Sequence, residues 1–328
     1  MSIQMTIIGM GRVGASLGLA LQSYKDQIER TGTDADLATL RKAVKMGALD
    51  KSVHNIEASV EGADIVVLAL PLDEVRQALE IIAPALKPGA VILDTSASKV
   101  AIAGWVKELL PPERYYLTMS PSLNPEYLQE MDEGLDSARA DLFKNSLMAI
   151  TAPATTHPDA LRLASDITAL IGAQPYYADP YEFDGLMAAA DVLPRLTAAA
   201  LLHAITDQPS WREGRKVAGR AFLDATSPIA DPIERKRYGQ FALLNAENTI
   251  RMLDDMIQTL QEARDLIAGQ DQDGLHEFLE TALESREKWL SDRRAGVWDM
   301  AGEKVELPAR GEVFGRLFGL RPKKEDKK

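Results

Sequence analysis

Met5-Thr6-Ile7-Ile8-Gly9-Met10-Gly11-Arg12-Val13-Gly14 is the stretch that decides the fold of the first half of the chain. An apolar strand, a G-x-G-x-x-G turn and an apolar helix in this order predict a dinucleotide-binding unit. Gly9 permits a sharp turn, Gly11 lets a diphosphate approach the backbone, and Gly14 lets the helix pack close to the strand. The free N–H groups that open the helix would then face the phosphates.

An acidic residue follows at the spacing that such a unit uses for the ribose. Asp34 lies 20 residues after the last glycine of the motif and closes a second extended stretch, Gly32-Thr33-Asp34. Its carboxylate can accept hydrogen bonds from ribose hydroxyls and would repel the 2′-phosphate of NADP, which favours NAD. The alternative role of Asp34 is to cap the helix that begins near Ala35-Asp36-Leu37. NADP stays open as the cofactor because Arg41 and Lys42 follow nearby.

Composition excludes several classes of function. The chain has 328 residues, enough for two domains, and its net charge of −12 argues against general nucleic-acid binding. It has no cysteine, so disulfides, thiolate nucleophiles and Cys–zinc sites are excluded, and its four scattered histidines predict no metal site. The first strand begins almost at Met1 and no apolar run approaches the ~20 residues that span a bilayer. We therefore expect a cytoplasmic protein with no membrane contact.

The first half of the chain alternates short β-rich runs with helical patterns. This alternation predicts an α/β fold with a doubly wound parallel sheet of the Rossmann type. One run, Ile65 to Leu70, is apolar throughout, as expected for a strand buried on both faces, and Pro71 ends it. The dinucleotide-binding domain is expected over residues 1–173. Its later strands and helices are predicted at residues 65–70, 73–86, 91–94, 100–110, 115–118, 147–151 and 158–172.

The second half is predicted to be helical. Residues 185–205 are rich in Ala and Leu on nearly every face, which is typical of a helix buried in a domain or between subunits. Pro194 should kink this helix. Residues 240–268 place apolar side chains at steps of three and four, which predicts a long amphipathic helix ending at Gly269. Residues 275–290 show a similar pattern.

These patterns predict an all-helical dimerisation domain over residues 184–295. Its extent of apolar helix surface suggests a homodimer, and an intramolecular bundle is the alternative. Residues 296–328 form an extension, and its charged end, Arg321 to Lys328, is expected to be disordered.

Several segments together resemble the prephenate/arogenate dehydrogenase family. The resemblance covers Ile3 to Leu290 and depends on the order and spacing of modest motifs. It implies an NAD(P)-dependent dehydrogenase of tyrosine biosynthesis, with Gly9, Gly11, Arg12, Val13, Gly14, Asp34, Leu70 and Pro71 at the cofactor. The matching segments are Gly9 to Gly14; Thr33-Asp34 with Leu40 to Asp50; Ala63 to Pro71; Leu86 to Ala90; Leu93-Asp94 with Lys99; Asp141-Leu142-Phe143; Ile171-Gly172-Ala173; Asp184; Leu193-Pro194; Phe222 to Thr226 with Ile229-Ala230; and Asn245.

The motifs that carry catalysis in this family are altered. The family's Gly-Gly-His-Pro is Thr118-Met119-Ser120-Pro121, so Ser120 replaces the histidine that assists hydride transfer. The family's Asp-x-Gly-Ser-x-Lys is Asp94-Thr95-Ser96-Ala97-Ser98-Lys99, which places Ala97 at the serine position. By the resemblance, the candidate catalytic residues are Ser120, Lys99 and Ser98.

The substrate-binding motifs are altered as well. The family's Ser-His-Leu-Pro-His is Asp191-Val192-Leu193-Pro194-Arg195, and its carboxylate-binding arginine is replaced around Ser227-Pro228. Arg195 and Arg220 are the candidate replacements, and an ion pair with Asp191 is the alternative role of Arg195. These losses indicate a substrate other than prephenate, with weak or absent activity on prephenate itself. A non-catalytic NAD(P)-binding paralogue with a regulatory or sensor role is the alternative function.

Overall fold

The computed structural model describes residues 2–130, 132, 134–153, 156–230, 235–296 and 298. The end of the chain, predicted to be disordered, lies outside these residues. The chain divides into two compact units, Met1–Asp179 with Lys288–Lys328, and Pro180–Glu287.

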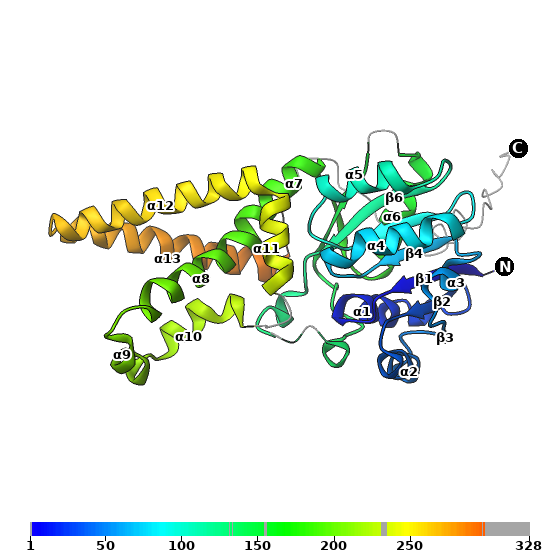
Figure 1. Ribbon diagram of the computed structural model, residues 1–328, viewed down its shortest axis with the longest axis horizontal. Helices are drawn as coiled ribbons and strands as arrows, with labels where there is room; N and C mark the ends of the chain where they lie inside the picture. The colour runs from blue at the N-terminus through cyan, green and yellow to red at the C-terminus, as the bar shows by residue number, and fades with distance from the viewer. Residues whose placement is uncertain are drawn as a thin grey trace, which may run out of the picture. The chain divides into compact units, whose positions relative to one another are not determined.

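The first unit is built on one eight-stranded sheet with the order β3-β2-β1-β4-β5-β6-β7-β8 (Figure 1). All neighbouring strands are parallel except β6 and β7, which are antiparallel. The predicted Rossmann-type fold is therefore confirmed. The strands are β1 (Ile3–Ile8), β2 (Ile28–Thr33), β3 (Lys51–Ser52), β4 (Ile65–Leu68), β5 (Val91–Asp94), β6 (Tyr115–Pro121), β7 (Leu147–Thr151) and β8 (Gln174–Tyr177).

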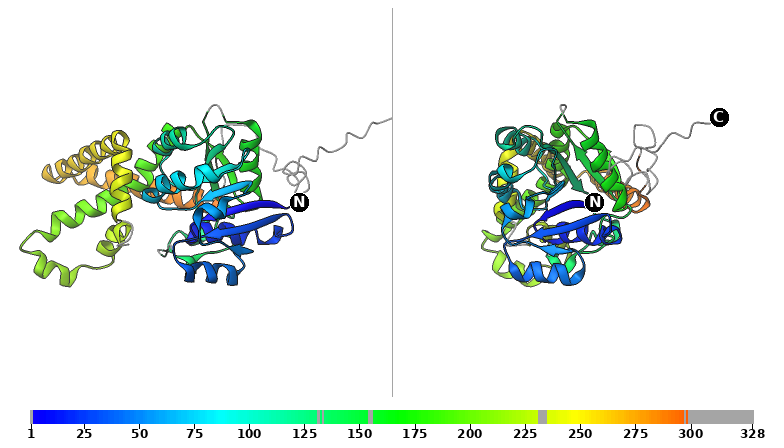
Figure 2. Two further views of the ribbon diagram at one scale, coloured as in Figure 1. Left: turned by 45° about the vertical axis from the view of Figure 1, so that its right-hand side comes forward. Right: turned by 90° about the vertical axis from the view of Figure 1, so that its right-hand side faces the viewer.

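Helices cover both faces of this sheet, as the turned views show (Figure 2). The predicted strand over residues 65–70 ends at Leu68, and Pro71 is the N-cap residue of the next helix. The helices are α1 (Arg12–Ala20), α2 (Leu37–Met46), α3 (Ile56–Val60), α4 (Leu72–Ile82), α5 (Val100–Leu109) and α6 (Pro158–Leu170).

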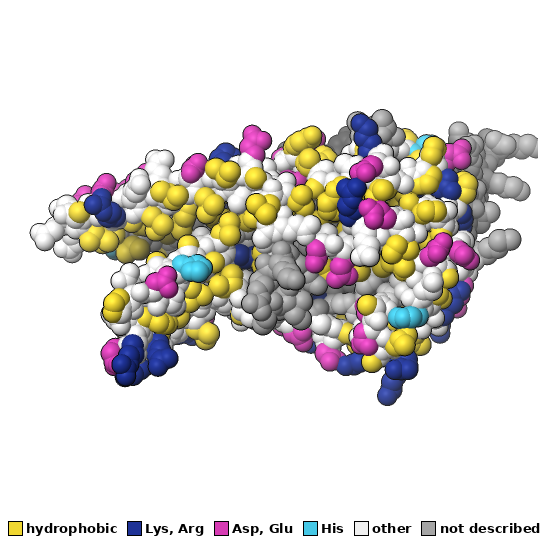
Figure 3. Space-filling model, viewed as in Figure 1, with side chains coloured by type: hydrophobic (Ala, Val, Ile, Leu, Met, Phe, Trp, Pro, Cys, Tyr) yellow, Lys and Arg dark blue, Asp and Glu magenta, His cyan; other side chains and the backbone are white. Residues whose placement is uncertain are grey.

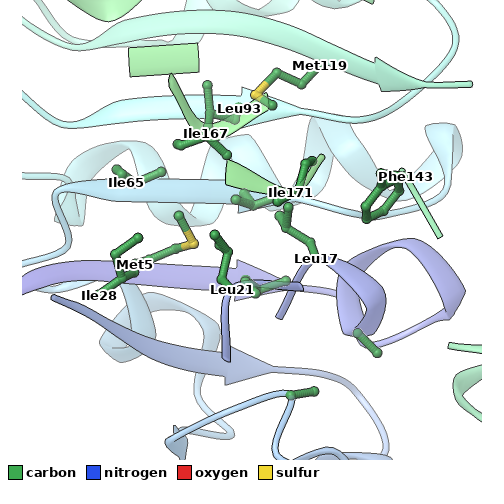
Figure 4. Close-up of a cluster of buried hydrophobic side chains, with 14 of the residues drawn as sticks. Met5, Leu17, Leu21, Ile28, Ile65, Leu93, Met119, Phe143, Ile167 and Ile171 are labelled. Atoms are coloured by element: carbon green, nitrogen blue, oxygen red, sulfur yellow. The ribbon is translucent and has the colours of Figure 1, made fainter. Parts of the chain in front are cut away.

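The main core lies on one face of the sheet, under α1 and α6 (Figure 4). Leu17 and Leu21 from the α1 segment and Ile167 from α6 are buried with Met5 of β1 and Leu93 of β5. Burying such side chains contributes roughly 1.5–3 kcal/mol each, which holds α1 firmly on the strand that precedes it.

The strand register brings the ends of β1, β2, β4 and β5 to the same edge of the sheet, beside the middle of β6. Ile8 is paired with Thr33 of β2 and with Leu68 of β4, Leu68 with Asp94 of β5, and Asp94 with Thr118 of β6. The strand order reverses at β1, which has β2 on one side and β4 on the other. Ligands of open α/β sheets bind at this carboxyl edge beside such a reversal, so the edge is where a site is expected.

The second unit is helical. The predicted helix over residues 185–205 is divided by a π-helical turn, Ala188–Val192, directly before the helix that contains Pro194. Proline cannot donate a backbone hydrogen bond, and a π-turn is one way in which a helix accommodates that loss. The helices are α7 (Pro180–Met187), α8 (Leu193–Thr206), α9 (Trp211–Val217), α10 (Arg220–Thr226), α11 (Arg235–Leu244), α12 (Ala246–Ala268) and α13 (Gln272–Ala295), whose end from Lys288 is counted with the first unit.

The predicted helix over residues 240–268 is in fact two helices, α11 and α12, which meet at Asn245. The buried Asn245 side chain donates a hydrogen bond from Nδ2 to the Asp184 carbonyl oxygen at 2.7 Å. This contact fixes the chain where the helix is broken.

One stretch of the second unit, Pro180–Thr206, is long and apolar enough to cross a membrane by length and composition alone, and an 18-residue window within it has a mean hydropathy of 1.4. This differs from the expectation that no run approaches that length. The stretch contains Asp191 and Arg195, which pair with each other, and charged residues are rare in membrane-spanning helices. A helix buried between protein surfaces has the same composition.

Candidate functional site

The glycine-rich turn between β1 and α1 has the geometry that its motif predicts. Gly9 has φ +93°, and a Cβ there would overlap the Ala69 carbonyl oxygen. A Cβ on Gly14 would overlap the Gly9 carbonyl oxygen. Gly11 is the N-cap residue of α1 with no side-chain cap, so the first amides of the helix have no side-chain acceptor at the cap. Such amides form a binding site for an anion.

The neighbouring strand end borders the same turn. Leu70 and Pro71 follow β4, and Leu70 Cδ2 lies 3.1 Å from the position that a Gly9 Cβ would occupy. Both residues are half-buried, as is Val13 in the first turn of α1. The structure therefore brings Gly9, Leu70 and Pro71 together at the carboxyl edge of the sheet.

Asp34, directly after β2, is oriented by two backbone amides. Its Oδ2 accepts a hydrogen bond from the Met10 N–H at 2.8 Å, and its Oδ1 accepts one from the Asp36 N–H at 2.9 Å. The alternative role of Asp34 as a helix cap is wrong, because Asp36 caps α2 by accepting from the Ala38 and Thr39 amides. The Asp34 carboxylate is thus fixed against the glycine-rich turn, where a ribose would lie.

Arg12 has a different environment from the other residues of the turn. Its side chain is buried and forms an ion pair with Glu130, at 3.1 Å between Nη2 and Oε2. It also donates to the carbonyl oxygens of Glu130 and Tyr127, at 3.3 and 3.5 Å. Sequence reasoning missed this contact because Glu130 lies 118 residues away in the chain and no motif marks it. The guanidinium is therefore held by protein groups, and the Arg12 backbone amide is left for a ligand.

The end of β5 carries a buried carboxylate with three donors. Asp94 is fully buried and accepts from Tyr116 Oη at 3.0 Å, from Ser96 Oγ at 2.6 Å and from the Ser96 amide at 3.2 Å. Burial raises the pKa of the Asp94 carboxyl above its usual range, and the positive charge of Lys99 opposes this rise. Asp94 therefore fixes the loop that follows β5.

Lys99 and Ser120 are brought together at this edge. Lys99 Nζ donates hydrogen bonds to Ser120 Oγ and to the Ser96 carbonyl oxygen. Ser120 Oγ also lies 2.8 Å from that carbonyl oxygen. Lys99 is 1% exposed and Ser120 is half-buried, so the ammonium group lies behind the serine hydroxyl. An ammonium group hydrogen-bonded to a hydroxyl can exchange a proton with a ligand that reaches the hydroxyl.

Ser98 lies in the same loop but does not join this pair. It is 1% exposed, and its Oγ has no hydrogen-bond partner among the described residues. A buried hydroxyl without a partner is unfavourable, and such groups are frequent at functional sites.

The two candidate substrate-binding arginines lie in the second unit, and the structure does not bring them together. Arg195 pairs with Asp191, at 2.7 Å between Nη2 and Oδ1, and donates to the Pro228 carbonyl oxygen at 3.1 Å. Its guanidinium also lies 3.7 Å from the centre of the Tyr238 ring. The Arg220 side chain is 92% exposed beside Asp224. The ion pair considered as the alternative role of Arg195 is therefore present.

Among the residues that the structure describes, no group of three His, Asp or Glu side chains is arranged to hold a metal ion.

Two family models match the chain, one for each half. The nucleotide-binding domain of prephenate dehydrogenase matches residues 17–177, beginning just after the glycine-rich turn. The dimerization domain of prephenate dehydrogenase matches residues 179–281.

Individual relatives are similar over most of their length. Cyclohexadienyl dehydrogenase of Zymomonas mobilis is 26% identical, over 85% of this chain and 94% of the relative. The solved arogenate dehydrogenase of Synechocystis is 24% identical with a TM-score of 0.71, over 88% of this chain and 100% of that one. The prephenate dehydrogenase of A. aeolicus, solved with hydroxyphenyl propionate and NAD+, is 21% identical with a TM-score of 0.76, over 88% of this chain and 98% of that one. These comparisons confirm the resemblance found in the sequence and the expected class of enzyme, a dehydrogenase with a nucleotide-binding domain.

Proposed function

Because the chain belongs to the prephenate dehydrogenase family, we propose that it transfers a hydride between a small carboxylic-acid alcohol and NAD. The observation that carries this proposal is the contact between Lys99 and Ser120 at the carboxyl edge of the sheet, in the unit that contains the dinucleotide turn. NAD, when bound, supplies the hydride acceptor at the nicotinamide C4.

The residues for the coenzyme are arranged as NAD requires. The diphosphate would be held by the amides of Gly11, Arg12 and Val13 at the start of α1, where Gly9 and Gly14 keep the backbone close. The ribose would be held by Asp34, whose carboxylate is fixed by the Met10 amide. An acid at this position disfavours a 2′-phosphate, which supports NAD over NADP.

Ser120 and Lys99 would handle the proton of the substrate hydroxyl. In reduction, Lys99 Nζ would pass a proton to Ser120 Oγ as Ser120 passes its own proton to the substrate oxygen, and the substrate carbon would receive the hydride. Oxidation would run the same relay in reverse, so that the alcohol proton ends on Lys99 Nζ. A serine hydroxyl alone is a poor proton acceptor at neutral pH, so the contact with Lys99 supplies the basic group. Ser98, with its unpartnered hydroxyl, would bind the substrate or nicotinamide side of the site.

Prephenate is not the substrate that this site favours. Ser120 replaces the family's histidine, and neither arginine candidate is free to bind a carboxylate in the way that the family's arginine does. Arg195 is engaged by Asp191, Pro228 and Tyr238, and Arg220 is exposed. A pocket without a bidentate arginine binds a carboxylate more weakly by about 2–5 kcal/mol.

The replacement of the family's histidine by Ser120 and the lack of a free carboxylate-binding arginine also favour a second candidate. This candidate is an NAD-binding paralogue without dehydrogenase activity. The two candidates share the coenzyme site and differ in turnover. Thermal melting with and without NAD, followed by assays of NAD reduction with prephenate, arogenate and related hydroxy acids, separates them. Stabilisation by NAD with turnover of one acid supports the dehydrogenase, and stabilisation without any turnover supports the paralogue.

The second unit is proposed to form a homodimer. Seven large apolar side chains of α11, of α12 and of the part of α13 up to Glu287 are more than half exposed in the single chain. Figure 3 shows hydrophobic side chains gathered along α12. Exposed apolar surface of this extent marks a protein interface. The residues of this apolar stripe are Leu243, Ile250, Ile257, Leu260, Ile267, Leu279 and Leu283. A cytoplasmic location stays a prediction from the sequence.

A further inference from the structure

Two cations of the nucleotide-binding unit, Arg12 and Lys42, pair with acids from one segment of the chain. This acidic segment, residues 125–139, lies between β6 and β7 and includes two 3₁₀ turns, Pro125–Tyr127 and Leu135–Ser137. Glu130 pairs with Arg12, and Asp136 pairs with Lys42 of α2. Glu130 Oε1 also lies 3.9 Å from Arg139 Nη2.

Arg12 is the first residue of α1, so its backbone amide belongs to the proposed diphosphate site. Its side chain is 1% exposed and that of Glu130 is 35% exposed. The Arg12 Nε–H is buried without an acceptor among the described residues. The guanidinium therefore retains an unused donor, while its charge is offset by a carboxylate that solvent can reach.

We propose that Glu130 limits the affinity of the dinucleotide site by neutralising Arg12 beside the diphosphate, and so adapts the site to the less charged coenzyme. The inference rests on the proposed binding of NAD. An unopposed Arg12 would attract the diphosphate and, more strongly, a coenzyme with an additional 2′-phosphate. Glu130 thus acts together with Asp34, which faces the ribose, in favouring NAD over NADP.

The acidic segment has other attachments, so removing the charge of Glu130 should leave it in place. Ser16 Oγ accepts a hydrogen bond from the Arg139 amide at 2.9 Å, and Leu135 and Ala138 are buried in the main core. Arg12 also donates to two backbone carbonyls of the segment, and these contacts do not depend on the carboxylate. A change in coenzyme affinity in the Glu130→Gln variant would therefore result from the lost charge of Glu130 and not from a displaced segment.

The test is calorimetric titration of NAD and NADP into the full-length protein, the Glu130→Gln variant and the Glu126→Gln variant. Glu126 is an exposed acid of the same segment, so its variant removes the same charge away from Arg12. We expect Glu130→Gln to tighten NAD binding about three- to tenfold and NADP binding by a larger factor, with Glu126→Gln within about twofold of the unaltered protein. The gain should disappear in the Arg12→Gln/Glu130→Gln double variant.

Unchanged or weaker NAD binding in Glu130→Gln, with an unaltered melting temperature, would overturn the inference. It would also be overturned if the gain persisted in the double variant. If neither the unaltered protein nor the Glu130→Gln variant binds NAD or NADP, the proposed function itself is contradicted. That result differs from the results above, which overturn only the role of Glu130.

Discussion

Lys99 donates a hydrogen bond to the Ser120 hydroxyl, from the loop after β5 to the end of β6. The pair depends on strand register, since Asp94 at the end of β5 is paired with Thr118 of β6, two residues before Ser120. Lys99 lies buried behind the half-exposed serine, so a ligand would meet the hydroxyl first.

Replacing Lys99 should impair chemistry more than coenzyme binding. For the acid that supports turnover, Lys99→Met should lower kcat by about 100-fold or more, because Ser120 loses the group that exchanges its proton. The dissociation constant for NAD, measured by calorimetry, should change by less than about threefold. Ser120→Ala should show a similar loss, and the double variant should be little worse than either single one. Additive losses in the double variant would show that the two residues act separately.

The stability of Asp94→Asn should depend on pH. Burial raises the folded-state pKa of Asp94, so the folded protein binds this proton more tightly than the unfolded chain does. The unaltered protein therefore loses stability as the pH rises through that raised pKa, whereas an asparagine does not titrate. Urea unfolding should show Asp94→Asn gaining stability relative to the unaltered protein as the pH rises above the ordinary carboxyl range of about 4.

Asp36→Asn is the control, because its stability relative to the unaltered protein should change with pH in the opposite direction. Hydrogen bonds from the Thr39 side chain and from the Ala38 and Thr39 amides lower the pKa of Asp36. Its stabilising contribution is present at neutral pH and is lost as the pH falls, so Asp36→Asn should lose stability relative to the unaltered protein as the pH rises. A pH-independent difference for Asp94→Asn would contradict the raised pKa.

Gly9→Ala should destabilise the first unit and abolish NAD binding. The substitution places a Cβ against the Ala69 carbonyl oxygen at a φ of +93°, and overpacking with strain costs about 1–3 kcal/mol or more. Gly62→Ala is the control, because Gly62 has φ +74° with nothing within 4 Å of its Cβ position. It should lower the melting temperature less and leave NAD affinity intact. Equal effects of the two variants would mean that steric overlap at Gly9 is unimportant.

Arg195→Gln should weaken the second unit and leave NAD affinity unchanged. The variant loses the Asp191 ion pair, the contact with Pro228 and the Tyr238 stacking, which together contribute about 1–2 kcal/mol. Arg220→Gln, at an exposed site, should melt like the unaltered protein. If Arg195→Gln kept full stability and raised the KM for a carboxylate substrate, Arg195 would be a substrate-binding residue instead.

Charges on the apolar stripe should dissociate the dimer. Ile257→Glu with Leu260→Glu should shift the mass in multi-angle light scattering from two chains toward one, because buried unpaired charges are costly at an interface. Leu37→Glu, on the exposed face of α2 in the first unit, is the control and should leave the mass unchanged. A single-chain mass for the unaltered protein would contradict the proposed homodimer.

The sequence predicted the fold well where apolar runs and glycines dictate local structure. The β4 and β5 strands are continuous buried runs, and Gly9 and Gly14 have the close contacts that their motif requires. β3 and β8 had no such signal, since Lys51–Ser52 is short and exposed and Gln174–Tyr177 contains a proline. Polar contacts between residues far apart in the chain could not be predicted either, because no local sequence pattern marks them.

In the candidate site, too, the residues could be predicted from local motifs and the contacts between distant residues could not. Lys99 and Ser120 were each predicted as site residues, but neither their contact nor the Glu130 partner of Arg12 was predicted, because both depend on the folded chain. Asp36 and not Asp34 is the helix cap because α2 begins at Leu37, which places the N-cap position at Asp36.

The most direct test of the central claim is calorimetric titration of NAD and NADP into the unaltered protein and into Gly9→Ala. We expect the unaltered protein to bind NAD, to bind NADP more weakly, and Gly9→Ala to bind neither. An unaltered, folded protein that shows no affinity for either coenzyme would contradict the proposed dehydrogenase.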